Sequence, residues 1–101
     1  MRTRRLDDEL LAGVWREVAR LRAVDLRPLG YGHGELRIAV ADAAEGIVRA
    51  DLPALVGVPL DEAGRKAAAR ALARLEAAGL VVRLRLGGDA ARVTHVQLIE
   101  A

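Results

Sequence analysis

The chain has 101 residues, of which 52% are hydrophobic and 30% are charged, a balance typical of one globular domain rather than of a disordered segment. It contains no cysteine and no serine, which excludes disulfides, thiolate metal sites and nucleophilic catalysis by either side chain. Trp15 and Tyr31 are the only aromatic residues, so we expect a core of aliphatic side chains.

The net charge of +2 is distributed unevenly along the chain. Residues 6–62 carry a net charge of −5, and residues 63–92 carry a net charge of +5. A basic block beside an acidic one predicts a surface that faces a polyanion. The alternative interpretation is that the arginines are spread over solvated faces.

The sequence has no feature that predicts contact with a membrane. No apolar stretch approaches the roughly 20 residues that span a bilayer. The basic start "MRTRR" is followed at once by acidic residues, whereas an apolar run follows the basic start of a signal peptide. We therefore expect a cytoplasmic protein.

Residues 6–23 are predicted to form a helix, because their apolar side chains recur at helical spacing. Asp7, Asp8 and Glu9 are expected in its first turn, where carboxylates complement the positive end of the helix dipole. The apolar stripe can pack on the rest of the domain or on a second copy of the chain, and we expect a homodimer. The residues expected to dimerise are Leu10, Leu11, Val14, Trp15, Val18 and Leu21.

The next two segments are a connector and an ambiguous element. A proline and three glycines interrupt residues 25–34, which predicts a loop. In residues 35–45, Leu36, Ile38 and Val40 alternate as they would in a strand. The four alanines of the same segment favour a helix, and the following glycine ends it.

Two helices separated by a turn are predicted next. Residues 49–56 form a short helix with Asp51 as its N-cap and Gly57 as its C-cap. Asp61 caps the following helix, which runs to about Ala78. The buried face of this second helix is expected to consist of Ala68, Ala71, Leu72 and Leu75.

The last part of the chain is predicted to form a basic β-hairpin. Residues 80–86 alternate between apolar and basic side chains, which is typical of a half-buried strand. Residues 87–89, "GGD", form the turn, and residues 91–99 form the return strand. The residues expected to face the core are Val82, Leu84 and Leu86, and those expected on the other face are Arg83 and Arg85. Leu80 and Val82 are expected to anchor the hairpin to the core.

This order of elements resembles the winged helix-turn-helix domains of bacterial DNA-binding regulators. The resemblance is carried by "RADLPALVGVP" at residues 49–59 and "RALARLEAAGLVVR" at residues 70–83. It implies a mainly α fold with a small β-hairpin wing, formed by residues 25–101. Residues 1–24 are then an extra N-terminal helix that is available for dimerisation.

The resemblance implies that the second helix is a recognition helix that enters the major groove of DNA. The recognition-helix residues expected to contact DNA are Arg65, Lys66, Ala69, Arg70 and Arg74, and the wing residues are Arg83, Arg85 and Arg92. Asp61 and Glu62, at the start of this helix, would repel phosphate if they faced it. Alternatively, they cap the helix and point sideways.

The predicted function is sequence- or shape-selective binding of double-stranded DNA, by a small transcriptional regulator or a replication or partition accessory factor. With no asparagine and one glutamine, base readout is expected to depend on arginine–guanine contacts or on DNA shape. The alternative is a winged-helix adaptor that binds a partner protein instead of DNA.

We expect no enzymatic activity, no cofactor and no metal site. His33 and His95 are the only histidines, and no thiol or second ligand cluster accompanies them. His33, in a glycine-rich segment, is predicted to be a turn residue. His95 is predicted to face solvent or to pair with a residue on a neighbouring strand.

Overall fold

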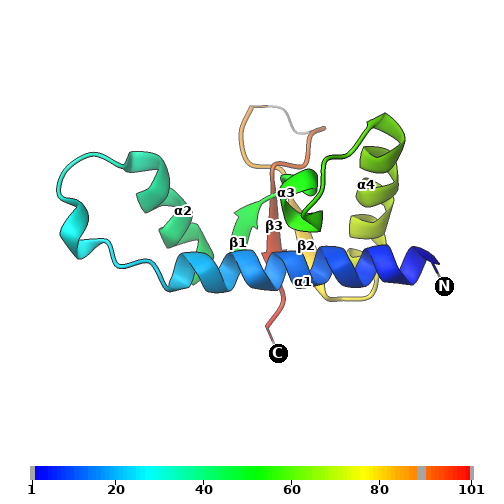
Figure 1. The fold of residues 1–101 in the computed structure, drawn as a ribbon, viewed down its shortest axis with the longest axis horizontal. Coiled ribbons are helices and arrows are strands. Elements are labelled where there is room, and N and C mark those ends of the chain that lie inside the picture. The colour runs from blue at the N-terminus through cyan, green and yellow to red at the C-terminus, as the bar shows by residue number, and fades with distance from the viewer. Residues whose placement is uncertain (1, 89–90, 101) are drawn as a thin grey trace.

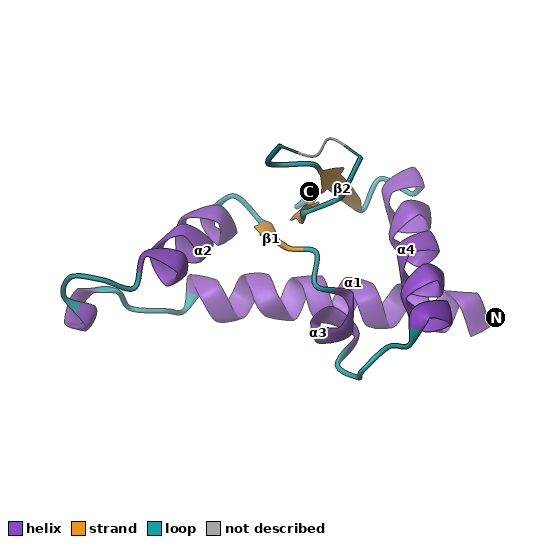
Figure 2. Cartoon of the chain, turned by 90° about the horizontal axis from the view of Figure 1, so that it is seen from above, coloured by secondary structure: helices purple, strands orange, loops and turns teal. Residues whose placement is uncertain are grey.

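The computed structural model describes residues 2–88 and 91–100 and is mainly helical in this part of the chain (Figures 1 and 2). The elements are α1 (Arg2–Arg22), a 3₁₀ turn (Arg27–Leu29), α2 (Gly34–Ala44), β1 (Ile47–Arg49), α3 (Leu52–Val56), α4 (Glu62–Ala77), β2 (Val81–Leu84) and β3 (His95–Leu98). The three strands form an antiparallel sheet in the order β1-β3-β2. The prediction of a mainly α domain with a small antiparallel β-structure is confirmed. No helix in the described ranges combines the length and the apolarity needed to cross a membrane.

Helix α1 lies along the long axis of the molecule and packs against α2, α3, α4, β1 and β3 (Figure 1). Its apolar stripe is part of the one hydrophobic core. Four of the six residues expected to dimerise are buried in this core, namely Leu10, Val14, Val18 and Leu21. The stripe therefore packs on its own domain. A second copy could reach only the other two residues of the six. Leu11 is partly buried, and Trp15 is 47% exposed.

The acidic residues near the start of α1 do not lie where we expected them. The helix begins at Arg2, so Asp7 lies beyond the first turn and the predicted dipole contact is wrong. Asp7 instead accepts hydrogen bonds from Arg74 of α4, with 2.7 Å between Nη2 and Oδ1 and 3.1 Å between Nε and Oδ2. These hydrogen bonds lower the pKa of the Asp7 carboxyl from its ordinary value of 3.8.

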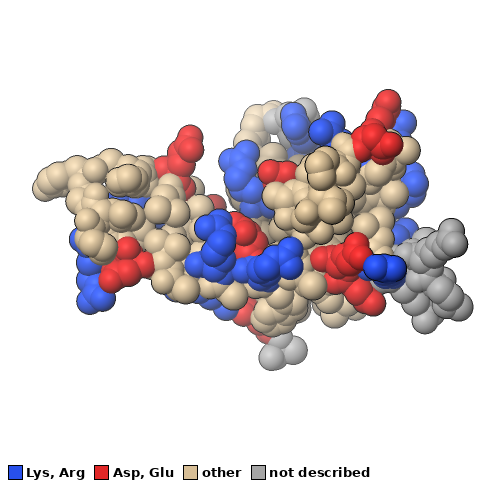
Figure 3. Space-filling view, in the orientation of Figure 1, with Lys and Arg blue, Asp and Glu red and all other residues tan. Residues whose placement is uncertain are grey.

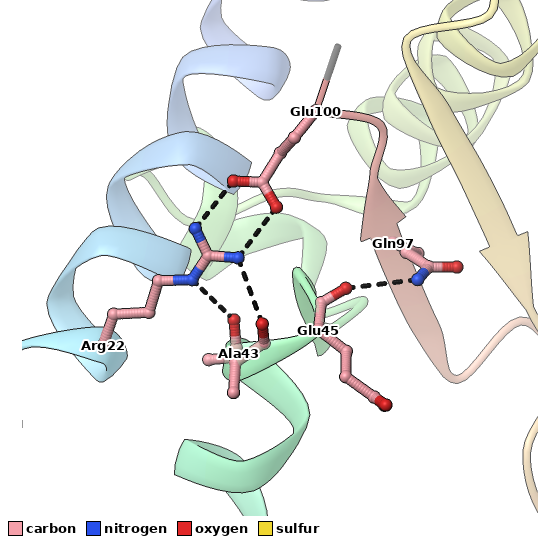
Figure 4. A network of polar contacts seen from close by, with 6 residues as sticks. Arg22, Ala43, Glu45, Gln97 and Glu100 are labelled. Atoms are coloured by element: carbon pink, nitrogen blue, oxygen red, sulfur yellow. Dashed lines mark hydrogen bonds and ion pairs between the residues drawn. The ribbon is translucent and has the colours of Figure 1, made fainter.

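The ambiguous segment is a helix, α2, as its alanines indicated. Arg22, in the last turn of α1, binds the C-terminal end of α2 (Figure 4). The last carbonyl groups of a helix have no partner within the helix. Arg22 Nε donates to the Ala43 carbonyl at 2.8 Å, and its two terminal nitrogens donate to the Glu100 carboxylate at 2.6 and 2.8 Å. Gln97 Nε2 donates to the Glu45 carbonyl at 3.1 Å, so α1, α2 and the end of β3 are tied together.

Helices α1 and α3 approach closely at Gly13. A Cβ atom placed on Gly13 would lie 1.9 Å from the carbonyl oxygen of Leu55, so any larger residue there would force the two backbones apart. The same carbonyl accepts a hydrogen bond from Arg16 Nη2 at 3.2 Å. Glycine thus brings the end of α3 against α1, and Arg16 satisfies the carbonyl that this contact covers.

The caps predicted for α3 and α4 are confirmed. The Asp51 carboxylate accepts from the Ala54 backbone N–H at 3.4 Å, and the Asp61 carboxylate accepts from that of Gly64 at 2.7 Å. Gly57 ends α3 with a φ of 91°, a conformation that favours glycine. All four residues expected on the inner face of α4 are buried.

The sheet differs from the predicted hairpin in two ways. Residues 47–49 form a third strand, so the short helix starts later than we expected. The face of the strand β2 that packs on the core is also the opposite of the one that we predicted. Val81 pairs with Leu98 and is 1% exposed, whereas Val82 and Leu84 are only partly buried and Leu86, beyond the strand, is exposed. Leu80 is likewise exposed, so the predicted anchors Leu80 and Val82 are wrong. The pairing with β3 determines which face of β2 points inward, because it places the side chains of that face beside Val96 and Leu98. Of the predicted turn at residues 87–89, residue 89 lies outside the described part of the chain.

Candidate nucleic-acid interface

The arginines divide into two groups by what their side chains contact. Among the arginine side chains that the structure describes, eight donate to a carboxylate or a backbone carbonyl: Arg5, Arg16, Arg20, Arg22, Arg27, Arg37, Arg74 and Arg83. The other five have no such acceptor within the described residues, and we call them the unpaired arginines. They are Arg49, Arg65, Arg70, Arg85 and Arg92.

The exposed side of α4 carries four of the five recognition-helix residues that we predicted. Arg65, Lys66, Ala69 and Arg70 are exposed, as expected from the burial of the opposite face. Lys66 Nζ lies 3.4 Å from the Glu62 carboxylate, one turn earlier, and both side chains are well exposed. Exposed pairs of this kind contribute little, so Lys66 is still available to another anion.

The fifth predicted recognition-helix residue, Arg74, differs from the others because it is paired within the chain. Its guanidinium is held by the Asp7 carboxylate of α1, and this contact raises the pKa of the Arg74 guanidinium from its ordinary value. The last of the predicted contact residues on this helix is thus already occupied, because a carboxylate from a distant part of the chain binds Arg74.

The two acidic residues at the start of α4 have separate roles. Asp61 is the N-cap, and its carboxylate points back at the Gly64 N–H. Glu62 pairs with Lys66. The interpretation that these acids cap the helix is therefore confirmed for Asp61.

Of the predicted wing residues, Arg83 is occupied within the chain. Its backbone N–H donates to Glu76 Oε2 at 2.7 Å, and its Nε donates to Glu76 Oε1 at 3.0 Å. These bonds lower the pKa of the Glu76 carboxyl, chiefly through the backbone N–H. Arg83 shares a sheet face with Val96 and is only partly exposed, whereas Arg85 and Arg92 are exposed.

Arg49 is the unpaired arginine that the sequence analysis missed. It is exposed at the end of β1, opposite His95 of β3. A groove of about 800 Å³ is lined by Arg49 of β1 and Arg65 of α4 together with Arg92, which lies in the segment before β3. The signal that could have identified it is a basic residue directly after the apolar pair Ile47 and Val48, but this signal depends on recognising a three-residue strand.

The space-filling view shows where the charges gather (Figure 3). Basic side chains collect over the β2–β3 hairpin and α4, beside an acidic patch near the start of α4. Along α1, basic and acidic side chains alternate. On this face, basic side chains thus gather around the hairpin and α4, with the acidic patch beside them.

The two histidines lie in different surroundings. His33 is exposed and has a φ of 55° just before α2, in agreement with its prediction as a turn residue. His95 is partly buried, and its Nδ1 lies 2.8 Å from the Thr94 hydroxyl. Within residues 2–88 and 91–100, no three His, Asp or Glu side chains are grouped so that they could hold a metal ion.

Comparison of the chain with protein-family models, with curated proteins and with solved structures gave no match. Its function is therefore inferred from the residues and their geometry.

Proposed function

We propose that this protein binds double-stranded DNA through α4 and the β2–β3 hairpin, as a small transcriptional regulator or a replication or partition accessory factor. The observation that carries this proposal is the position of the unpaired arginines. Two of them lie on α4, two lie between the strands β2 and β3, and one ends β1. Every other arginine whose side chain the structure describes already has an acceptor.

Charge repulsion gives this distribution a physical meaning. Like charges near one another repel, and water and salt only partly screen this repulsion. When a polyanion binds a surface whose guanidiniums have no carboxylate partners, it relieves this repulsion. Binding also releases counterions from the polyanion, and both effects favour the complex. Duplex DNA, with closely spaced phosphates, is the polyanion that fits a basic helix beside a basic hairpin.

The order of elements supports a winged-helix reading of this surface. From α2 to β3, the order is helix, strand, two helices and two strands, and five residues connect α3 to α4. In such a domain, α4 is the recognition helix, and its exposed residues Arg65, Lys66 and Arg70 face the major groove. Arg85 and Arg92 then meet phosphates or the minor groove.

The proposal is tested by titrating a fluorescent DNA duplex with the full chain at several salt concentrations. If the five unpaired arginines each meet one phosphate, the slope of log K against log salt is about −4 to −5. Arg85→Ala is expected to weaken all sequences equally, and Arg70→Ala to relax preference at one position if Arg70 reads a base.

Arg27→Ala is the control, because Arg27 is paired with Asp25 far from α4 and the hairpin. It is expected to behave like the unaltered chain. An absence of duplex binding even at low salt contradicts the proposal. Binding to an acidic polypeptide such as polyglutamate, without binding to the duplex, favours the adaptor function instead.

A further inference from the structure

We infer that Arg49, Arg65 and Arg92 form one phosphate-binding groove, here called the arginine groove, through which a strand of the DNA backbone passes. This inference rests on the proposed function for the source of the phosphate. It adds a contact outside the recognition helix and the hairpin, made by Arg49 at the end of β1.

The arginine groove is built where four segments meet. Its walls come from the end of β1, the start of α3, the first turn of α4 and the segment before β3. A hydrogen bond of 3.0 Å from the Ala50 N–H to the Thr94 carbonyl holds the first and last of these segments together. The groove is therefore part of the folded framework, not a gap between loose loops.

The other polar groups that line the arginine groove are already engaged. Asp51, the one acidic residue among the described lining residues, turns its carboxylate to the Ala54 N–H as the N-cap of α3. The Thr94 hydroxyl donates to the Leu86 carbonyl at 3.1 Å and accepts from the Leu86 N–H at 2.9 Å. Among the described lining residues, the charged donors left for a ligand are the three guanidiniums.

The chemistry of the guanidinium selects the ligand. Each guanidinium is a planar fork of N–H donors that matches two oxygens of a phosphate, and it remains charged at any physiological pH. Three such forks and the one carboxylate of the described lining leave an excess of two positive charges, which suits neighbouring phosphates of one DNA strand, each carrying one negative charge. Because Arg65 also belongs to α4, a phosphate held here lies next to the base-reading face. This position fits the backbone of a DNA strand whose bases α4 contacts.

The test compares Arg49→Gln and Arg49→Lys with Arg27→Gln, which removes the same charge at the far end of the molecule. Arg49 is exposed, so unchanged thermal unfolding is expected for all three variants. Arg49→Gln is expected to weaken duplex binding roughly tenfold and to reduce the salt slope by about 1. Arg49→Lys is expected to keep the slope and lose a smaller part of the affinity, because it keeps the charge but not the fork.

The outcomes separate this inference from the proposed function. If the unaltered chain binds the duplex and Arg49→Gln binds equally well with the same slope, the arginine groove is overturned and the proposed function stands. If the unaltered chain does not bind the duplex, the proposed function fails. The groove is then judged by NMR of arginine Nε–Hε signals during titration with inorganic phosphate. Shifts confined to Arg49, Arg65 and Arg92 support a site for free phosphate, and no shift overturns the site altogether.

Discussion

Gly13 determines how closely two helices of this protein approach. Glycine in a helix interior lowers stability relative to alanine by about 1 kcal/mol, so its presence in α1 needs a reason. The reason is the Leu55 carbonyl, which occupies the place that a Cβ atom would take. The backbone of α3 thus lies against the backbone of α1.

We expect Gly13→Ala to lower the free energy of unfolding by about 2 kcal/mol, because overpacking against backbone outweighs the gain in helix propensity. Chemical denaturation followed by circular dichroism measures this change. The control is Ala19→Gly at an exposed position of α1, with an expected loss of about 1 kcal/mol from propensity alone. Stabilisation by Gly13→Ala would contradict the close approach.

At the scale of elements, the Asp7–Arg74 pair joins the two helices that position the proposed DNA surface. It links the second turn of α1 to the last turn of α4, and the side chain of Asp7 is only 19% exposed. The pair thereby restrains the angle between α4 and α1. Sequence spacing could not predict it, because the two residues are 67 positions apart.

This pair predicts a pH dependence of stability. The pKa of Asp7 is lowered in the folded chain, so its contribution is fully present above its ordinary value of 3.8 and is lost as the pH falls through the lowered folded value. Asp7→Asn is expected to lower the unfolding temperature at neutral pH, and the difference from the unaltered chain is expected to narrow below about pH 4. This difference in unfolding temperature is measured by thermal unfolding monitored by circular dichroism, repeated down to about pH 2.

Asp8→Asn is the matched control for this prediction. Asp8 is exposed and has no ion-pair partner among the described residues, yet its substitution changes the net charge equally. It is expected to leave the unfolding temperature nearly unchanged. An equal effect of the two variants at neutral pH would show that Asp7 acts through net charge and not through Arg74.

Some elements could be predicted from the sequence because their signals are local. Asp51, Gly57 and Asp61 mark helix ends by capping, and the alanine-rich face of α4 follows from spacing alone. The strand β1 was missed because three residues carry almost no periodicity. The inner face of β2 was predicted wrongly, because an alternating pattern does not indicate which of the two sets of side chains faces the core.

The candidate site was less predictable than the fold for a related reason. Sequence identifies which residues are basic, but not which of them already have an acceptor. Arg74 and Arg83 looked equivalent to Arg70 and Arg85 until Asp7 and Glu76 were placed beside them. Only Asp7 comes from a distant part of the chain, but both pairings depend on the folded arrangement.

At the scale of the whole molecule, α1 and the remaining elements share one hydrophobic core. Leu10, Val14 and Val18 of α1 lie in the same buried cluster as Leu72 of α4 and Val96 of β3. We therefore expect the helix and the rest of the chain to unfold together.

Val14→Ala tests this expectation. Val14 is fully buried, so the substitution is expected to lower the free energy of unfolding by about 2 kcal/mol. Denaturation followed by Trp15 fluorescence, which reports on α1, and by far-ultraviolet circular dichroism is expected to give coincident transitions. Val58→Ala, at an exposed position between α3 and α4, is expected to change stability by less than about 0.5 kcal/mol. Two separate transitions would mean that α1 is an independent unit.

The bond from the Arg83 backbone N–H to Glu76 has a consequence for solubility. In the strand order β1-β3-β2, β2 is an edge strand with backbone groups that another chain can pair with. Glu76 blocks one of these donors, and the arginines of "VVRLRL" place charge along the edge. An Arg85→Ala protein therefore loses part of its protection against edge-to-edge aggregation, so its DNA affinity is best measured on material shown to be monodisperse.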